Sequence, residues 1–199
     1  MFITLFVVEV TEGATHFLYD IAGYAETRTR LYEEQQQVIA KHGDKITVEA
    51  LKDMAYLEAC LRESLRLNSI TQAVYRLAMQ DVEFSNGMRI PAGRVCFFNM
   101  HAMNRNPEFH QDANEYRPDR IADQPNVRAS TITPGFVTFG LGRNACPGRF
   151  IAVAEIMTLA AWLLRRYDFT TKSGRRPENQ MGATYRAIED PVIFTKRCS

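Results

Sequence analysis

Hydrophobic positions recur with a helical period from residue 1 to about residue 41, and no proline interrupts them. Gly13 and Gly23 are the weak points of this stretch. Two carboxylates, Glu9 and Glu12, lie within its apolar first part. A carboxylate that faces solvent at a helix end needs no explanation, whereas a buried one requires a partner or a chemical task. The pattern predicts one long helix and leaves the role of both carboxylates open.

A second helix is predicted from a cap at Thr47 to about Leu67. It follows a break at residues 41–44, where Gly43 suits a left-handed helix end. Its apolar stripe consists of Met54, Leu57, Leu61 and Leu65. The stripe indicates a helix that packs one face against the core.

A β-rich passage follows the second helix. Residues 81–84 and 95–98 are rich in strand-forming side chains. Between them lie Asn86 and Gly87, a pair typical of a tight hairpin, and a second turn at residues 91–93. We therefore expect short antiparallel strands here.

The last third of the chain combines irregular segments with one helix. Residues 121–138 carry the polar and proline composition of a long loop. The run from residue 148 to about 167 is apolar on nearly every face, which predicts a buried helix. Residues 169–171 and 192–194 are expected to pair as a small closing sheet. No second domain boundary is visible.

Composition narrows the class of protein. The chain has 199 residues, 46% of them hydrophobic, and a formal net charge of +1, so a sizeable core is possible and a nucleic-acid footprint is not indicated. Four widely spaced cysteines favour a reducing compartment over a disulfide framework. The apolar residues 1–10 are too short to span a bilayer and lack a basic start.

Residues 139–148 place one cysteine behind a loop of glycines and before a helix. Gly140 and Gly142 permit backbone conformations and close approaches that a Cβ would forbid. Pro147 suits the first position of the following helix. Cys146 would then lie at the positive end of that helix, which favours the thiolate form. No second cysteine or histidine lies at zinc-site spacing, so one axial ligand on iron is indicated.

A glycine-rich turn with an inert buried cysteine is the simpler interpretation of such a loop. The ten positions together resemble the haem-binding loop of the cytochromes P450, a family in which a cysteine thiolate ligates haem iron. The resemblance implies that Cys146 ligates the iron of haem b. The loop residues assigned to the cofactor are Phe139, Gly140, Arg143, Asn144 and Gly148. Asn144 replaces the basic residue that would pair with a haem propionate.

Glu63 and Arg66 lie three residues apart on the second helix, and Glu58 and Arg62 offer a similar pair. Such pairs are usually solvated and contribute less than about 1 kcal/mol. However, Glu63 to Arg66 resembles the Glu-x-x-Arg motif of the same family. Its partner would be Arg120, which ends a Tyr-Arg-Pro-Asp-Arg segment. The resemblance implies a structural network of Glu63, Arg66 and Arg120.

The first helix resembles the long helix that crosses the oxygen-binding face of the haem, because residues 18–20 read Leu-Tyr-Asp. The family carries an acid-threonine turn earlier in this helix, which guides protons to dioxygen. In this chain the turn falls on residues 5–9 and does not match, whereas a one-residue shift gives Glu9 followed by Val10 and Thr11. Glu9 and Thr11 are therefore the candidate catalytic residues.

The resemblance also concerns the sheet passage. Arg76 would reach a haem propionate, and residues 71–75 and 182–185 would contact the substrate. An exposed strand charge is the alternative for Arg76. His101 is either near the propionates or a capped surface residue.

Taken together, the resemblance implies a mainly α protein with small β-sheets, the C-terminal half of the cytochrome P450 fold from the oxygen-side helix through the cysteine loop. Residues 1–199 would be one partial domain whose N-terminal half and membrane anchor are absent. The expected activity is a haem-thiolate monooxygenase that inserts one oxygen atom from O2 into a hydrophobic small molecule, such as a terpenoid or other secondary metabolite. NADPH-cytochrome P450 reductase is the implied electron donor, with Arg143 and Arg149 as contacts, and the cytosolic face of the endoplasmic reticulum membrane is the implied location.

Two other functions stay open. The chain could be a truncated or non-canonical haem-binding protein without monooxygenase activity, which includes haem chemistry that needs no delivered protons. A helical interaction domain without haem is the third possibility. Haem ligation by Cys146 would distinguish both haem-binding functions from the interaction domain.

Overall fold

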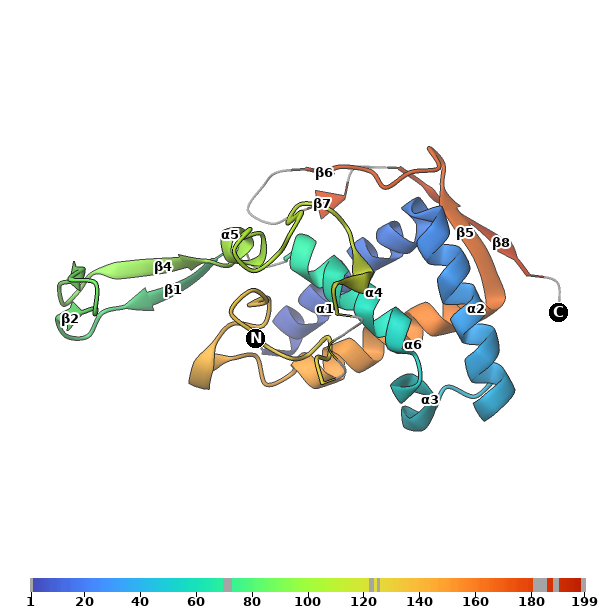
Figure 1. Cartoon of the computed structure of the whole chain (residues 1–199), viewed down its shortest axis with the longest axis horizontal. Helices are drawn as coiled ribbons and strands as arrows, with labels where there is room; N and C mark the ends of the chain where they lie inside the picture. The colour runs from blue at the N-terminus through green and yellow to red at the C-terminus, as the bar shows by residue number, and fades with distance from the viewer. Residues whose placement is uncertain are drawn as a thin grey trace.

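The computed structural model describes residues 2–69, 73–121, 124, 126–180, 186–187 and 190–197, with only the backbone described for residues 2–8, 180 and 186–187. Helices form the body of the molecule, and short two-stranded antiparallel sheets lie around them (Figure 1). The prediction of a mainly α protein with small sheets is confirmed.

The first predicted helix is in fact two, α1 (Phe2–Gly23) and α2 (Ala25–His42). Tyr24 leaves the helical conformation, with φ −109° and ψ 94°. The carbonyl of Ala22 at the end of α1 accepts hydrogen bonds from Arg28 Nη1 at 2.9 Å and Thr170 Oγ1 at 3.3 Å. The break is therefore stabilised by side chains from other elements, one of them 148 residues away.

The second predicted helix is also divided. Thr47 caps α3 (Val48–Lys52), as expected, through a 3.2 Å bond from Ala50 N to its hydroxyl. The chain then turns at Asp53 and Met54 before α4 (Ala55–Leu67). The carboxylate of Glu34 on α2 accepts from the backbone N–H groups of Tyr56 at 2.6 Å and Leu57 at 3.0 Å. A side chain of another helix thus caps α4, which local sequence cannot reveal.

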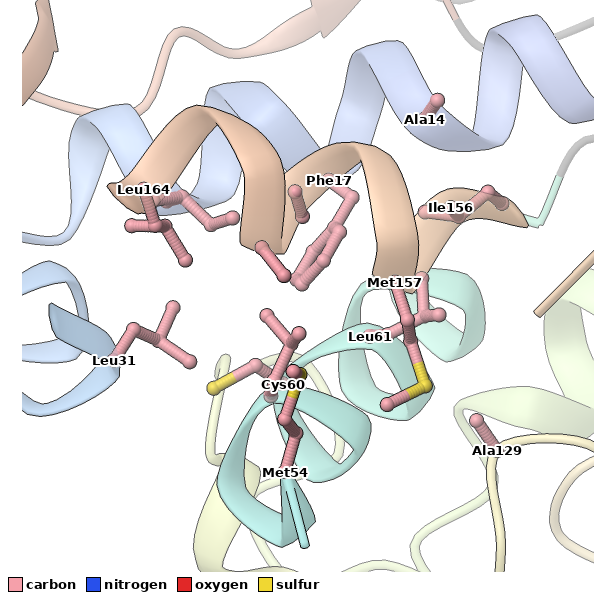
Figure 2. Packing of buried hydrophobic residues seen from close by; sticks show 14 of the residues in the cluster. Ala14, Phe17, Leu31, Met54, Cys60, Leu61, Ala129, Ile156, Met157 and Leu164 are labelled. Atoms are coloured by element: carbon pink, nitrogen blue, oxygen red, sulfur yellow. The ribbon is translucent and has the colours of Figure 1, made fainter. Parts of the chain in front are cut away.

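The core lies where α1, α2, α4 and α6 (Arg149–Arg166) meet. Figure 2 shows the ring of Phe17 between α6 and α4, with Leu61 and Met157 close by. The predicted apolar stripe of α4 is buried throughout. The prediction of a buried last helix is correct for only one side of α6, because its other side exposes Phe150, Ile151, Leu159 and Trp162.

The sheets are peripheral. Strands β1 (Ala73–Leu77) and β4 (Val95–Asn99) pair as a ribbon that projects from the helical body, with β2 (Val82–Glu83) and β3 (Arg89–Ile90) at its tip (Figure 1). The predicted hairpin at Asn86 and Gly87 is confirmed, since Gly87 has φ 82° between β2 and β3. The remaining short elements are α5 (Met100–Asn104), η1 (Pro118–Ile121), η2 (Gly142–Asn144), β6 (Asn179–Gln180) and β7 (Arg186–Ala187).

The predicted closing sheet is also present. Strand β5 (Tyr167–Thr171) pairs antiparallel with β8 (Val192–Lys196), so that Phe169 lies opposite Phe194. The sheet follows directly from the end of α6 and packs against α1. It therefore joins the end of the chain to the helical core.

Gly23 allows α1 to approach the segment before β6. A Cβ at Gly23 would overlap the backbone N and Cα of Arg176. We expect Gly23→Ala to lower the free energy of unfolding by about 1 to 3 kcal/mol, because backbone atoms cannot move aside as a flexible side chain can. Denaturant titration measures this, with Gln36→Ala on the exposed face of α2 as the control, expected to change stability by less than about 0.5 kcal/mol. Equal stability of both variants would contradict the close approach.

Candidate functional site

The cysteine loop is held by backbone hydrogen bonds and two left-handed glycines. Gly140 and Gly142 have φ 76° and 62°, a region that favours glycine. The N–H of Cys146 donates to the carbonyl of Phe139 at 2.8 Å, which closes the loop around η2. The glycines predicted from the sequence thus shape the turn that presents Cys146.

The junction with α6 differs from the prediction. The helix begins at Arg149 with Gly148 as its N-cap, so Pro147 precedes the cap and does not occupy the first helical position. Arg149 Nη1 donates to the carbonyl of Cys146 at 2.7 Å. The guanidinium therefore helps to fix the loop onto the start of the helix.

The side chain of Cys146 is half-buried and lines a cavity of about 220 Å³. Most of the lining is apolar, and it comes from α1, α4, β1, α5, the cysteine loop and α6. The apolar lining residues are Val10, Leu65, Val74, Met100, Phe139, Ala152, Val153 and Ile156. The polar lining is supplied by Glu9, Arg76, Thr138 and Asn144. One sulfur thus faces a largely apolar space with a few polar groups at its margin.

Arg76 is exposed, and the interaction that the structure gives it is a 2.8 Å bond from Nη1 to the carbonyl of Tyr75. Asn144 is also exposed. Both side chains are therefore available to a polar part of a ligand in the cavity. Arg143 is exposed outside the cavity lining, and Gly148 serves as the helix cap, so these two predicted cofactor residues do not line the cavity.

The structure separates the two candidate catalytic residues. Glu9 is half-buried and lines the cavity, whereas Thr11 is exposed and is not part of the lining. Two residues along an α-helix rotate a side chain by about 200°, so Glu9 and Thr11 face nearly opposite ways. Burial, and to a lesser extent the charge of Glu12, raises the pKa of Glu9. Of the two candidates, only Glu9 therefore lines the cavity with Cys146.

Glu63 is 4% exposed and accepts hydrogen bonds from two arginine side chains and one backbone N–H. Arg66 donates from Nε at 2.8 Å and from Nη2 at 2.7 Å, a bidentate pair. Arg120 Nε donates at 2.8 Å and the N–H of Arg117 at 3.0 Å. The structure therefore brings Glu63, Arg66 and Arg120 together, with α4 joined to the segment around η1.

The second helical pair did not form as expected. Glu58 bonds to Arg128 Nη1 at 2.9 Å and to the N–H of Ala129 at 3.0 Å. Arg62 is buried and donates to the carbonyls of Arg128 and Thr131 at 2.8 and 2.7 Å. The expectation of a solvated Glu58–Arg62 bridge is wrong, because both side chains bond to the loop at residues 128–131 instead.

Two residues that the sequence did not single out connect the Glu63 network to the cysteine loop. Asn104 is fully buried, and its carbonyl accepts from Arg66 Nη1 at 2.9 Å. Its side chain accepts from Val137 N at 2.8 Å and donates to Thr138 Oγ1 at 3.0 Å. Thr138 in turn donates to the carbonyl of Leu65 at 3.0 Å. No local pattern marks these residues, because their partners lie more than 30 positions away.

His101 lies within hydrogen-bonding distance of Arg105, with its Nδ1 2.8 Å from Nη1. Burial and the charge of Arg105 lower the pKa of His101. This histidine is not part of the cavity lining, which favours the local structural role. The predicted substrate residues 71–72 and 182–185 lie outside the described residues.

Comparison with known sequences decides the family. The sequence model described as Cytochrome P450 matches residues 10–191. The chain belongs to the cytochrome P450 family. This P450 chain is 35% identical over 197 residues to cytochrome P450 monooxygenase 151 of Postia placenta, covering 92% of this chain and 39% of that protein.

Other similar proteins are also cytochromes P450. The cytochrome P450 monooxygenase terP of Tolypocladium album is 30% identical over 202 residues, which cover 98% of this chain and 40% of terP. The mitochondrial cytochrome P450 12b1 of Drosophila acanthoptera is 29% identical over 84% of this chain and 33% of that protein. The chain thus spans between 33% and 40% of the length of these relatives. None of the described helices combines the length and apolar character that a membrane crossing needs.

The Glu63 network predicts a large stability effect in this P450. Glu63→Gln removes the charge that neutralises Arg66 and Arg120, and an uncompensated buried charge costs about 3–5 kcal/mol. Denaturant titration should show a loss of that size. Glu83→Gln, in the exposed pair with Arg89, is the control and should cost less than about 1 kcal/mol. Similar losses in the two variants would contradict a buried network.

The same carboxylate predicts a dependence of stability on pH. Burial acts to raise the pKa of Glu63, but the hydrogen bonds and charges of Arg66, Arg117 and Arg120 outweigh it, so the pKa lies below the ordinary value of 4.5. The stabilisation is complete above the unfolded pKa and is lost as the pH falls through the lower folded pKa. We expect the wild type to lose more unfolding free energy than Glu63→Gln as the pH falls below 4.5. Parallel stability curves would contradict this assignment.

Proposed function

We propose that this chain is the C-terminal part of a cytochrome P450 monooxygenase, from the oxygen-side helix through the cysteine loop, in which Cys146 ligates the iron of haem b. The observation that carries the proposal is the half-buried sulfur of Cys146 in a largely apolar cavity, behind a loop held by Gly140 and Gly142. Membership of the P450 family and the monooxygenase names of the relatives support it. Residues 1–199 form one part of that domain.

The residues of the cavity fit such a cofactor chemically. A porphyrin supplies four nitrogen ligands itself, so the protein needs to provide one axial donor, and Cys146 is the cysteine in the lining. The apolar side chains of Phe139, Val153 and Ile156 suit an apolar macrocycle. The guanidinium of Arg76, which has no carboxylate partner in the described part of the chain, suits a propionate, and the Asn144 amide suits a neutral hydrogen bond to one.

Different groups of the protein would have different roles in the reaction. When bound, haem supplies the activation of O2, and a thiolate ligand favours O–O cleavage. Cys146 would hold the cofactor, with its loop fixed by the Phe139 carbonyl and by Arg149. Val10, Leu65 and Met100 would keep water away from the reacting face. The Glu63 network would keep α4 and the segment around η1 in place, a structural role.

Glu9 would move protons within the cavity. Because burial and the charge of Glu12 raise its pKa, a larger fraction of Glu9 carries a proton near neutral pH than an exposed glutamate does. We do not assign this step to Thr11, which is exposed and lies outside the cavity lining. The carboxyl group of Glu9 is therefore the candidate proton donor.

The proposal extends to the partners of the whole protein. The substrate would be a hydrophobic small molecule, such as a terpenoid or another secondary metabolite, together with O2. NADPH-cytochrome P450 reductase would deliver the electrons, and the exposed Arg143 is the better candidate contact, because Arg149 bonds to the Cys146 carbonyl. The cytosolic face of the endoplasmic reticulum membrane is the proposed location of the complete protein.

The ligand assignment is tested by the carbon monoxide difference spectrum of the reduced protein. The wild type should give the red-shifted Soret band of a thiolate ligand, and Cys146→Ser should lose it because a hydroxyl donates less electron density. Cys96→Ser is the matched control, since Cys96 is also half-buried but lies on β4 outside the cavity lining. A red-shifted band that persists in Cys146→Ser would overturn the proposal.

A second candidate function is a haem protein without monooxygenase activity. It is favoured by one observation: Val10, not a threonine, accompanies Glu9 in the cavity. The two functions differ in their need for a proton donor. Haem chemistry without delivered protons, such as isomerisation or reduction, would not depend on Glu9.

The Glu9→Gln variant distinguishes the two candidate functions. For a monooxygenase we expect O2-dependent and NADPH-dependent product formation to fall by about a hundredfold, the size of a general acid contribution. Glu33→Gln, on the exposed face of α2, is the control and should leave the rate unchanged. Unchanged turnover in Glu9→Gln would remove Glu9 from the mechanism, and turnover without O2 would favour the second function.

A further inference from the structure

A second cavity, of about 420 Å³, lies between α4 and the irregular segments on either side of η1. It has none of its lining residues in common with the Cys146 cavity. Four arginines line it, namely Arg62, Arg66, Arg117 and Arg120, whereas Glu63 is the one carboxylate among its described lining residues. The described lining of the cavity therefore carries an excess of positive charge.

Arg62 is the unusual member of this set. Its side chain is buried, 7% exposed, and its guanidinium stacks 3.8 Å from the ring centroid of Phe136. The carboxylates beside it on α4 are already engaged, because Glu58 pairs with Arg128 and Glu63 with Arg66 and Arg120. Among the residues that the structure describes, no carboxylate therefore forms an ion pair with Arg62, and a buried cation without such a partner is costly to the folded state.

The groups that hold Arg62 are neutral. Nη1 donates to the carbonyls of Arg128 and Thr131, and Nη2 has a long contact of 3.5 Å with Thr133 Oγ1. Burial lowers the pKa of Arg62 to about 10, which still leaves the group charged at neutral pH. The nearby charges of Glu63 and Glu58 favour the charged form, but Arg62 forms no ion pair with either carboxylate, and its hydrogen bonds go to neutral oxygens.

Arg117 adds a second available donor group at the mouth. It is exposed, and its Nη1 pairs with Asp112, a residue outside the cavity lining. The exposed residue Gln111 also lines the cavity. Exposed ion pairs are weak, so Arg117 can exchange its partner for a ligand at small cost.

We propose that this cavity binds a small phosphate-class oxyanion, either inorganic phosphate or the phosphate group of a monoester, with Arg62 and Arg117 as its cationic ligands. Guanidinium groups are planar forks that match the oxygens of a phosphate, and such charge-assisted hydrogen bonds are about twice as strong as neutral ones. The site does not depend on haem, so it can exist whether or not the proposed function holds.

The test is isothermal titration of the purified full-length protein with inorganic phosphate at constant ionic strength, with NaCl as the control titrant. We expect saturable binding of phosphate that weakens as salt rises. Phenyl phosphate is titrated in parallel: tighter binding than inorganic phosphate indicates a monoester as the natural source, and equal or weaker binding indicates the free ion. Heats no different from those of NaCl for both probes would overturn the proposal.

Variants locate the site. Arg62→Met keeps the contact with Phe136 but removes the charge, and Arg117→Gln removes the exposed cation. Each should weaken phosphate binding by about tenfold or more, the effect of one charged hydrogen bond. Arg89→Gln is the matched control for Arg117→Gln, because Arg89 is also an exposed arginine in an exposed ion pair and lies at the tip of the ribbon. If Arg62→Met does not fold, the comparison of Arg117→Gln with Arg89→Gln decides, and equal affinities in these two variants would overturn the assignment.

Discussion

The buried carboxylate of Glu63 is the constraint on which much of this structure depends. A charge that is 4% exposed is tolerated only when its partners are fixed, and here the partners come from α4 itself and from the segment around η1. The same arginines donate to backbone carbonyls of Asn104, Ala113 and Glu115. Residues 105–117 form no helix or strand, so these donors replace the hydrogen bonds that secondary structure would otherwise supply.

Asn104 connects the Glu63 network to the cysteine loop. Its carbonyl is held by Arg66, and its side chain holds Val137 and Thr138, immediately before Phe139. Thr138 is tied back to Leu65 on α4. The loop that presents Cys146 is therefore positioned by α4 as well as by its own glycines. A disturbance of the Glu63 network would weaken the support of Asn104 by Arg66 and the position of α4 itself.

The sequence predicted the parts of this arrangement that depend on local geometry. Helical and strand periods, the Thr47 cap and the left-handed glycines at positions 87, 140 and 142 follow from short-range sterics and hydrogen bonding, and they are present. The Glu-x-x-Arg spacing placed Glu63 beside Arg66 for the same reason. Gly23 marked a weak point beside the break at Tyr24, but the contacts that stabilise the breaks at Tyr24 and Met54 could not be predicted, because Thr170 and Glu34 are distant in sequence. Thr11 was a candidate because it follows Val10, which occupies the position of the family's threonine, but a helix turns residues two positions apart to nearly opposite sides.

The two arginines of α4 show why spacing alone does not decide the role of a charge. Arg62 and Arg66 lie one helical turn apart, and each has a glutamate three or four residues before it. Arg66 forms a bidentate pair with Glu63, which it shares with Arg120, whereas Glu58 bonds to the backbone of Ala129 and to Arg128. Arg62 is left with carbonyl oxygens and the face of Phe136. Both arginines line the same cavity, but in the described part of the chain only Arg66 forms an ion pair. An anion that enters the cavity would give Arg62 the ion pair that Glu63 already gives to Arg66.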